Sequence, residues 1–217
     1  MVELPFVKDG FLKKQSAEKS REPQEALKNS GAEAKSEKLR AQVLGRIVQR
    51  YQDYIEERET KTISELKALI QPYNQAVTKA KQQIAESFHP YIYSENFDAA
   101  SDAAIALVAR LETVQLPLNF WLSFEDMEEI GAGDEVGKAV FLCSLLRSLD
   151  SADAKVCICR SKKPYVIFSS ASASYLCDIQ KGTKSALIGS LGDGKIGDEQ
   201  IVYMFSDSAY EDFTEAE

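Results

Sequence analysis

The feature that most constrains the fold is an almost continuous run of apolar residues from about Lys138 to Leu149. The run is too long for an ordinary β-strand, and it is apolar around most of a helical circumference. It therefore predicts a helix buried at the centre of a domain. The preceding segment, Gly131 to Asp134, predicts a polar turn, so the N-terminus of this helix would face a place where chemistry can occur.

The segments on either side predict helices first and strands afterwards. Capping boxes at Thr62 and Ser123 predict short helices, one stopping before Pro72 and the other ending at Gly131. A helix is expected over 74–88, and another begins near Asp98. Strands are predicted at Lys155 to Arg160, Tyr165 to Ser169, Tyr175 to Ile179, Ala186 to Ile188 and Ile201 to Phe205. This order is typical of the α+β class.

The two ends of the chain differ from this middle part. Residues 1–35 have mixed charge and few large apolar groups, which predicts a flexible or disordered arm. Residues 36–58 carry one apolar stripe and predict an amphipathic helix, which packs on its own domain or pairs with another copy. At barely three heptads, packing on its own domain is favoured over a coiled coil. The domain itself is expected at 59–206, and 207–217 is expected to be an acidic flexible tail.

The residues around the buried helix resemble a known family. The run NFWLSFEDMEEIGAGDEVGKAVFLCSLLRSL is similar to the nucleophile segment of archaeal and bacterial members of the transglutaminase-like superfamily. The resemblance extends over about Thr60 to Gln180. It implies a papain-like fold, in which a central buried helix packs on an antiparallel sheet with N-terminal helices. The matching residues are Trp121, Glu125, Gly131, Gly133, Asp134, Ala139, Leu142, Ser144, Leu145, Leu146 and Arg147.

The catalytic positions of that family are substituted. A cysteine opens the buried helix in the family, and a histidine and an aspartate on the following strands complete the set. The resemblance places Glu135, Lys163 and Asp178 at these three positions. A carboxylate does not replace an attacking thiolate without a suitable acid and base beside it, and an unperturbed lysine titrates near ~10.4. We therefore expect no catalytic residues at these degenerate positions.

The substituted positions suggest a different role for the cleft. Glu135 at a helix N-terminus and a facing Lys163 would form a partly buried ion pair, so the former active site becomes a structural clamp. The alternative is that Glu135 is a solvated acid of the first helical turn. The residues expected to line the cleft and bind a ligand are Trp121, Glu125, Asp134, Glu135, Lys163, Tyr165 and Asp178.

The four cysteines and the single histidine of this chain do not replace the missing catalytic cysteine and histidine. Cys143 lies inside the apolar run, Cys157 and Cys159 share one face of a strand, and Cys177 lies on another strand. A Cys-x-Cys pair without a second close pair favours packed thiols over zinc, so no metal site is expected. His89 precedes Pro90 and is interpreted as a helix-ending residue.

Neither a cofactor nor a nucleic-acid or membrane partner is expected. Residues Gly189 to Ile196 nearly spell a phosphate-binding loop, but Ile196 cannot bind magnesium, and an apolar strand follows where a helix is required. The 26 basic and 34 acidic residues give a net charge of -8, which argues against general affinity for nucleic acid or anionic lipid. With no membrane span, no signal peptide and four cysteines, the chain is expected in the cytoplasm.

Three classes of function remain open. The first is an inactive transglutaminase-like domain that binds or scaffolds an unidentified protein or peptide through its degenerate cleft. The second is a hydrolase or transferase with altered chemistry, in which Glu135 and Asp178 act as acid and base. The third is an interaction protein that works through its N-terminal helix and arm, including possible self-association through residues 36–58.

Overall fold

The structure is a computed structural model that describes residues 37–52, 61–115, 122–171, 173–187, 191 and 194–213. The chain divides into two units, Met1–Asp53 and Tyr54–Glu217, and each is considered by itself. In the first unit, residues 37–52 form a helix. The predicted helix at 36–58 is therefore present over 37–52, while the arm at 1–35 and residues 53–58 lie outside the described residues.

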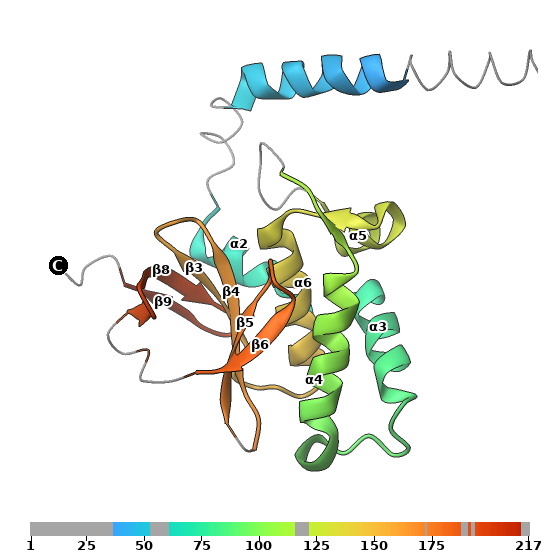
Figure 1. Cartoon of the computed structure of the whole chain (residues 1–217), viewed down its shortest axis with the longest axis vertical. Coiled ribbons are helices and arrows are strands. Elements are labelled where there is room, and N and C mark those ends of the chain that lie inside the picture. The colour runs from blue at the N-terminus through green and yellow to red at the C-terminus, as the bar shows by residue number, and fades with distance from the viewer. Residues whose placement is uncertain are drawn as a thin grey trace, which may run out of the picture. The chain divides into compact units, whose positions relative to one another are not determined.

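The second unit confirms the predicted α+β class. Its helices precede most of its strands along the chain, and Figure 1 labels most of these elements. The helices are α2 (Ile63–Ala68), α3 (Gln75–Ala85), α4 (Tyr93–Ala109), α5 (Phe124–Ile130) and α6 (Glu135–Ser148). The strands are β1 (Glu112–Thr113), β2 (Ala132–Gly133), β3 (Lys155–Cys159), β4 (Pro164–Ser169), β5 (Ser174–Asp178), β6 (Thr183–Ala186), β7 (Lys195–Ile196), β8 (Glu199–Phe205) and β9 (Tyr210–Asp212).

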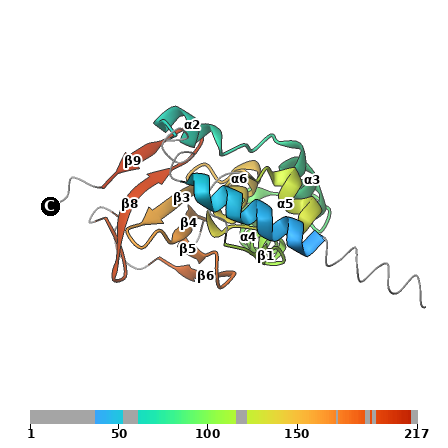
Figure 2. The ribbon, with the colours of Figure 1, turned by 90° about the horizontal axis from the view of Figure 1, so that it is seen from above.

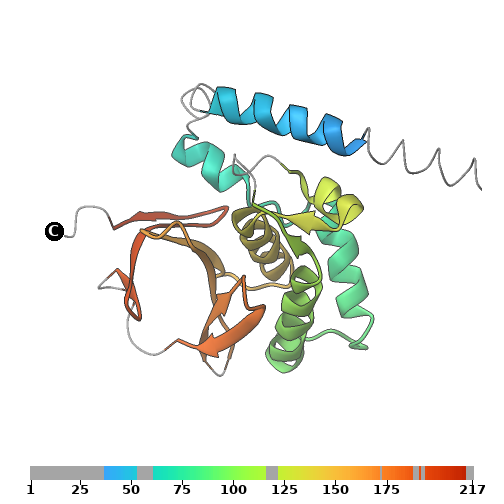
Figure 3. The same cartoon turned by 45° about the horizontal axis from the view of Figure 1, so that its top comes forward.

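The main sheet is antiparallel and follows the order β6-β5-β4-β3-β8-β7. Strand β9 pairs with residues 203–205 of β8, on the edge opposite β3. The sheet curls strongly, as the end-on view of its strands in Figure 3 shows. A register shift between Ile158 and Cys159, where β3 meets β8, is one local source of this curvature. A second, two-stranded sheet joins β1 and β2 in parallel and lies beside the N-terminus of α6.

Helix α6 is the centre of the second unit. It packs on β3 and β4 with one side and on α3 and α4 with the other, so it is enclosed between the sheet and the outer helices. Figure 2 shows α3, α4 and α5 on one side of the curled strands. The prediction of a buried central helix is confirmed, because twelve of its fourteen residues are buried. Among the described residues, no helix is both long and apolar enough to cross a bilayer.

The two faces of the curled sheet serve different cores. One face packs on α6 through alternating side chains such as Val156, Val166 and Phe168. The other face encloses a smaller apolar cluster inside the curl, which contains Cys157 and Tyr165. The sheet is therefore buried on both sides at β3 and β4, which explains why these two strands are apolar almost throughout.

The turn before α6 depends on two glycines. Gly131 ends α5 in the left-handed region, with φ 73°, where glycine avoids the strain of a Cβ atom. Gly133 belongs to β2, and a Cβ atom there would lie 2.7 Å from Met127 Sδ. The buried Lys138 secures the partner strand, because its Nζ donates to Leu111 O at 2.8 Å and to Thr113 Oγ1 at 2.9 Å. These contacts fix where α6 begins.

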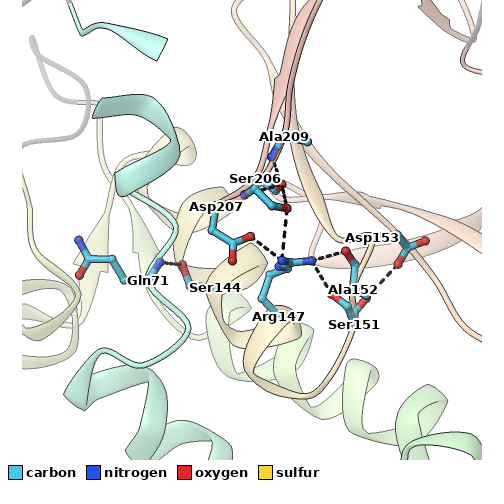
Figure 4. Close-up of polar contacts among 10 residues, drawn as sticks. Gln71, Ser144, Arg147, Ser151, Ala152, Asp153, Ser206, Asp207 and Ala209 are labelled. Atoms are coloured by element: carbon cyan, nitrogen blue, oxygen red, sulfur yellow. Dashed lines mark hydrogen bonds and ion pairs between the residues drawn. The ribbon is translucent and has the colours of Figure 1, made fainter. Parts of the chain in front are cut away.

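Two polar side chains hold the rest of α6 in place, and Figure 4 shows the contacts of both. Ser144 Oγ accepts a hydrogen bond from the backbone N–H of Gln71 at 3.0 Å, which ties the connection after α2 to the helix. Near the other end, Arg147 Nη2 pairs with Asp207 Oδ1 at 2.6 Å, and its Nη1 donates to the carbonyls of Ser151 and Ala152. Arg147 thus joins α6 to the loop before β3 and to the turn between β8 and β9.

The described structure extends beyond the predicted domain end at residue 206. Asp207 binds Arg147, and Tyr210–Asp212 form β9, although the sequence assigned 207–217 to a flexible tail. The correction has a physical cause, since edge pairing with β8 satisfies the backbone of an acidic segment that lacks an apolar pattern. At the near-match to a phosphate-binding loop, Ile196 lies in β7, which pairs antiparallel with β8. A strand therefore follows this segment, as expected, where a phosphate-binding loop requires a helix.

The close approach at Gly133 gives a test of this packing. We expect Gly133→Ala to lower the free energy of unfolding by about 1–3 kcal/mol, because the added methyl group overlaps Met127 Sδ. Met127→Ala alone should cost about 2–5 kcal/mol through the cavity it leaves. The double variant should lose less stability than the sum of the two single losses, because alanine at position 127 leaves room for the methyl group at position 133. Urea unfolding followed by circular dichroism measures all three, and fully additive losses would contradict the contact.

Candidate functional site

The first turn of α6 carries two adjacent carboxylates. Asp134 is the N-cap and is only 4% exposed. Its Oδ2 accepts a hydrogen bond from the backbone N–H of Gly137 at 3.0 Å, which satisfies one free donor of the helix end. Its Oδ1 is also buried, yet it has no hydrogen-bond partner among the described residues. Gly137 makes this cap possible, because a Cβ atom there would lie 2.8 Å from Asp134 Oδ1.

Glu135 is the first residue of α6. A carboxylate at this position is stabilised by the positive end of the helix dipole, an effect worth about 0.3–1 kcal/mol. Among the described residues, no hydrogen bond or ion pair engages this carboxylate directly. The charge of Glu135 acts on Lys138. Burial lowers the pKa of Lys138, and this effect is stronger than the opposite effect of the negative charge of Glu135.

An ion pair lies at the adjoining strand ends. Lys163 Nζ donates to Asp178 Oδ2 at 3.0 Å, and the two side chains are 25% and 14% exposed. The other oxygen of Asp178 accepts the backbone N–H groups of Gln180 and Lys181, each at 3.1 Å. Lys163 Nζ also lies 5.0 Å from the centre of the Tyr165 ring. Asp178 is thus held in place by a turn of its own chain and by a cation that rests over an aromatic ring.

The pair shifts the pKa values of both partners. The hydrogen bond to Asp178 raises the pKa of Lys163, and this effect exceeds that of desolvation, which acts in the opposite direction. Burial alone would raise the pKa of Asp178, but the hydrogen bonds from Lys163 and from the backbone of Lys181, together with both lysine charges, lower it. Both groups are therefore held in their charged forms.

These elements border one recess of about 500 Å³. Its described walls come from the end of β1, the first turn of α6, the β3–β4 hairpin, the turn after β5 and the start of β8. The hairpin is tight: Lys162 adopts φ 66° and donates its N–H to Cys159 O at 2.8 Å. This turn places Lys163 at the recess. The lining residues are 113–115, 134–136, 161–163, Gln180 and Glu199.

The structure brings most of the predicted cleft residues together. Asp134, Glu135 and Lys163 line the recess. Asp178 is bound to Lys163, and Tyr165 lies under the same ammonium group inside the sheet. The predicted residues that remain are Glu125 and Trp121.

Glu125 and Trp121 stand apart from this group. Glu125 borders a different recess of about 290 Å³, whose walls include Phe124, Met127 and Val140 and are mainly apolar. Trp121 lies outside the described residues. The two recesses flank the first turn of α6, with Glu135 bordering the polar one and Gly137 the apolar one.

The predicted clamp between Glu135 and Lys163 is wrong in its choice of partner. Lys163 pairs with Asp178, and the ion pairs of the described residues do not include one between Lys163 and Glu135. The physical reason is proximity within the sheet, because β4 and β5 are neighbours and Tyr165 is directly opposite Asp178 in the register. Asp178, the carboxylate closest to Lys163 within the sheet, therefore forms the ion pair with its ammonium group. The carboxylate of Glu135 does not take part in this pair.

The thiols and the imidazole do not meet at this recess. All four cysteines and the single histidine belong to the described residues, and none of them lines it. Burial raises the pKa of Cys143, and it raises the pKa of Cys177 to about 12. The hydrogen bond shared by Cys157 and Cys159 raises the pKa of Cys157 and lowers that of Cys159, but both thiols are at most 1% exposed. His89 lies in the connection between α3 and α4.

Several lining residues were not identified from the sequence. Ser161, Lys162 and Gln180 are close in sequence to Lys163 and Asp178, so proximity along the chain could have suggested them. Glu199 gives no such signal: it comes from the start of β8, and its Oε2 accepts a hydrogen bond from Ser161 Oγ at 2.8 Å. Only the pairing of β8 with β3 brings it to the recess. In the described part of the chain, no group of three or more metal-binding side chains is placed to hold an ion.

The sequence matches no protein-family model, and searches among curated proteins and among solved structures give no match either.

The contact between Lys163 and Asp178 predicts a specific pattern of energetic coupling. Lys163→Met and Asp178→Asn should each lower the free energy of unfolding, and the double variant should recover part of the loss. We expect a coupling energy on the order of 1–2 kcal/mol, between the values of exposed and fully buried pairs. Lys163→Met combined with Glu135→Gln should be additive, because these side chains are not paired. Urea denaturation at pH 7 measures both cycles, and coupling confined to the Glu135 cycle would contradict the observed pairing.

Proposed function

We propose that this protein is a catalytically inactive domain of the transglutaminase-like type, which binds a protein or peptide partner through the recess at the N-terminus of α6. The observation that carries the proposal is that Glu135 and Lys163 line the same recess, although they are not paired, and that Asp178 is bound to Lys163. These are the three positions at which the resemblance implies a thiol, an imidazole and a carboxylate. Four free cysteines suit the cytoplasmic location that we propose with it.

The chemistry of the three groups supports binding over acyl transfer. A general base must lose its proton near the working pH, but Asp178 raises the pKa of Lys163 and so keeps the amine protonated. The carboxylate of Glu135 has no neighbouring imidazole to activate it. The buried cysteines are not positioned to replace the missing nucleophile. The recess therefore offers charged and hydrogen-bonding groups to a ligand without a means of attacking it.

The same contacts weigh against an enzyme that uses Glu135 and Asp178 as acid and base. Such an enzyme would need a carboxyl group with a raised pKa to donate a proton near neutral pH. The pKa of Asp178 is lowered, and its oxygens already accept bonds from Lys163 and from two backbone N–H groups. Asp178 is therefore a structural anchor for Lys163.

An activity assay tests the proposal directly. We expect the full chain to incorporate no amine into glutamine-containing protein and to hydrolyse no peptide or amide substrate above the rate of a buffer blank. Any turnover should be measured again with Glu135→Ala, and with Glu129→Ala as the control, since Glu129 is exposed on α5 away from the recess. Turnover that Glu135→Ala abolishes and Glu129→Ala preserves would reject the binding proposal and favour altered chemistry.

A second candidate function rests on the N-terminal helix. Within residues 37–52, the side chains of Leu39, Val43, Leu44, Ile47 and Tyr51 are each about half exposed or more, at 49–58%. An apolar stripe of this length on one helix is typical of a surface that pairs with another helix or with a groove. We propose as the alternative that this helix supports self-association or binds a partner, with the second unit as a rigid support.

Truncation separates this alternative from the recess. We expect deletion of residues 1–58 to abolish self-association, measured by analytical ultracentrifugation across a concentration series. Leu44→Glu with Ile47→Glu in the full chain should have the same effect, because both substitutions place charge in the apolar stripe. A sedimentation coefficient that is independent of concentration in the unmodified chain, or unchanged association after the deletion, would contradict it.

A further inference from the structure

We propose that Cys157, Cys159 and Met204 form a binding site for a soft monovalent metal ion of the copper(I) type. The site is separate from the proposed function, because these residues belong to the smaller apolar cluster inside the curl of the sheet and do not line the recess. Each of them is at most 2% exposed. Of the described residues, seven are buried in this cluster, and three of the seven carry sulfur.

The strand register brings the three side chains together. Cys157 and Cys159 are two residues apart on β3, so their side chains point to the same face of the sheet, and they share a hydrogen bond. Met204 on β8 is the direct cross-strand partner of Cys157, and the Cβ atoms of such partners lie about 4.5–5.5 Å apart. The methionine side chain is long and flexible, so its thioether can reach an ion held between the two thiols.

The number and kind of the ligands select the ion. Counted over histidine, cysteine, aspartate and glutamate, the described residues contain no group of three that could hold a metal. A tetrahedral zinc ion therefore lacks its ligands there. Copper(I) prefers thiolate and thioether ligands, and it accepts two sulfur atoms in a linear arrangement or three in a trigonal one. The Cys-x-Cys pair and Met204 supply this set.

The same spacing disfavours a disulfide within the Cys-x-Cys pair. Alternate residues of an extended strand have Cα atoms about 6.4–6.8 Å apart, at the upper end of the range of about 4.4–6.8 Å that a disulfide spans. A metal ion lies between its two sulfur ligands, so binding it does not require β3 to shorten. The pair is therefore better suited to holding an ion than to forming a covalent bond with itself.

Binding exchanges protons for the ion. Two thiols release their protons to solvent and one monovalent cation takes their place, so the occupied site carries one negative charge. Lys163 lies over the ring of Tyr165, which is the cross-strand partner of Cys157. The pKa of Cys159 is lowered by the hydrogen bond from Cys157 and also by the charge of Lys163, while burial raises it. Lys163 thus favours the negative charge that the site acquires.

The ion would enter at the Cys159 end of the pair. Cys159 is the last residue of β3, and the exposed hairpin residues 160–162 follow it. The N–H of Lys162 closes this hairpin by donating to Cys159 O at 2.8 Å. Opening of this one turn is therefore enough to bring the end of the pair to the surface.

The test uses the full chain, reduced and kept free of oxygen. Copper(I) is titrated in competition with a coloured copper(I) chelator, and zinc(II) is titrated in parallel. We expect one copper(I) ion per chain, bound at least about a hundredfold more tightly than zinc(II). X-ray absorption at the copper edge should show a shell of sulfur ligands alone. This measurement needs no variant, so it decides the question even where a substituted chain fails to fold.

Substitutions identify the ligands. Cys159→Ala should weaken copper(I) binding by at least about a hundredfold and Met204→Leu by about tenfold, because groups that only support a metal ligand already contribute ~10–100-fold. Cys177→Ala is the matched control and should leave binding unchanged, since Cys177 is equally buried on β5 but belongs to the larger core. Urea unfolding shows that each variant is folded before the titration.

Four outcomes would each overturn the inference and leave the three sulfur atoms as core packing. They are no binding of copper(I), nitrogen or oxygen atoms in the ligand shell, equal binding of zinc(II), and equal losses in Cys159→Ala and Cys177→Ala. Unchanged binding in Met204→Leu would likewise contradict the three-sulfur site. None of these results depends on turnover of a peptide or amide, which tests the proposed function alone.

Discussion

The burial of α6 on all sides is the constraint on which the second unit depends. The helix has the curled sheet on one side and α3 and α4 on the other, so its side chains lie at the centre of the larger core, which these neighbouring elements complete. A helix in this position cannot shift or rotate without opening a cavity. Polar contacts also hold the helix along its length: Lys138 in its first turn secures β1, Ser144 in its second half holds the connection after α2, and Arg147 holds the loops at the far end. The recess is therefore built on a rigid element.

This arrangement gives a physical reason for several residues between Gly131 and Arg147. Gly131 allows a left-handed turn, Gly133 leaves room for Met127, and Asp134 caps the helix. Ser144 and Arg147 hold neighbouring segments against it. All of these roles are structural and need no thiol. Asp178 likewise has a structural role, because it holds Lys163.

The sequence predicted the central elements better than their edges. Capping boxes located α2 and α5 because their side chains bond the helix ends directly. Helix α4 starts at Tyr93, before the expected start near Asp98. The sequence did not reveal this start because the N-cap residue, Ile92, has no side chain that can cap the helix. Instead, Asn96 accepts the Ile92 N–H from within the helix. β1 and β2 went unrecognised because two-residue strands have no periodicity of their own, and β9 because it is defined by pairing with β8.

For the site, the sequence by itself determined which charged groups would stand at the start of the buried helix and at the adjoining strand ends. The apolar run fixed the helix, and the turn residues fixed Asp134 and Glu135 at its first turn. Only the tertiary structure decided how these charges are partnered. Strand register placed Lys163 against Asp178, and the β3–β8 pairing brought Glu199 to the recess. Local patterns encode secondary structure, whereas the pairing of charges depends on distances between segments far apart in the chain, which only packing sets.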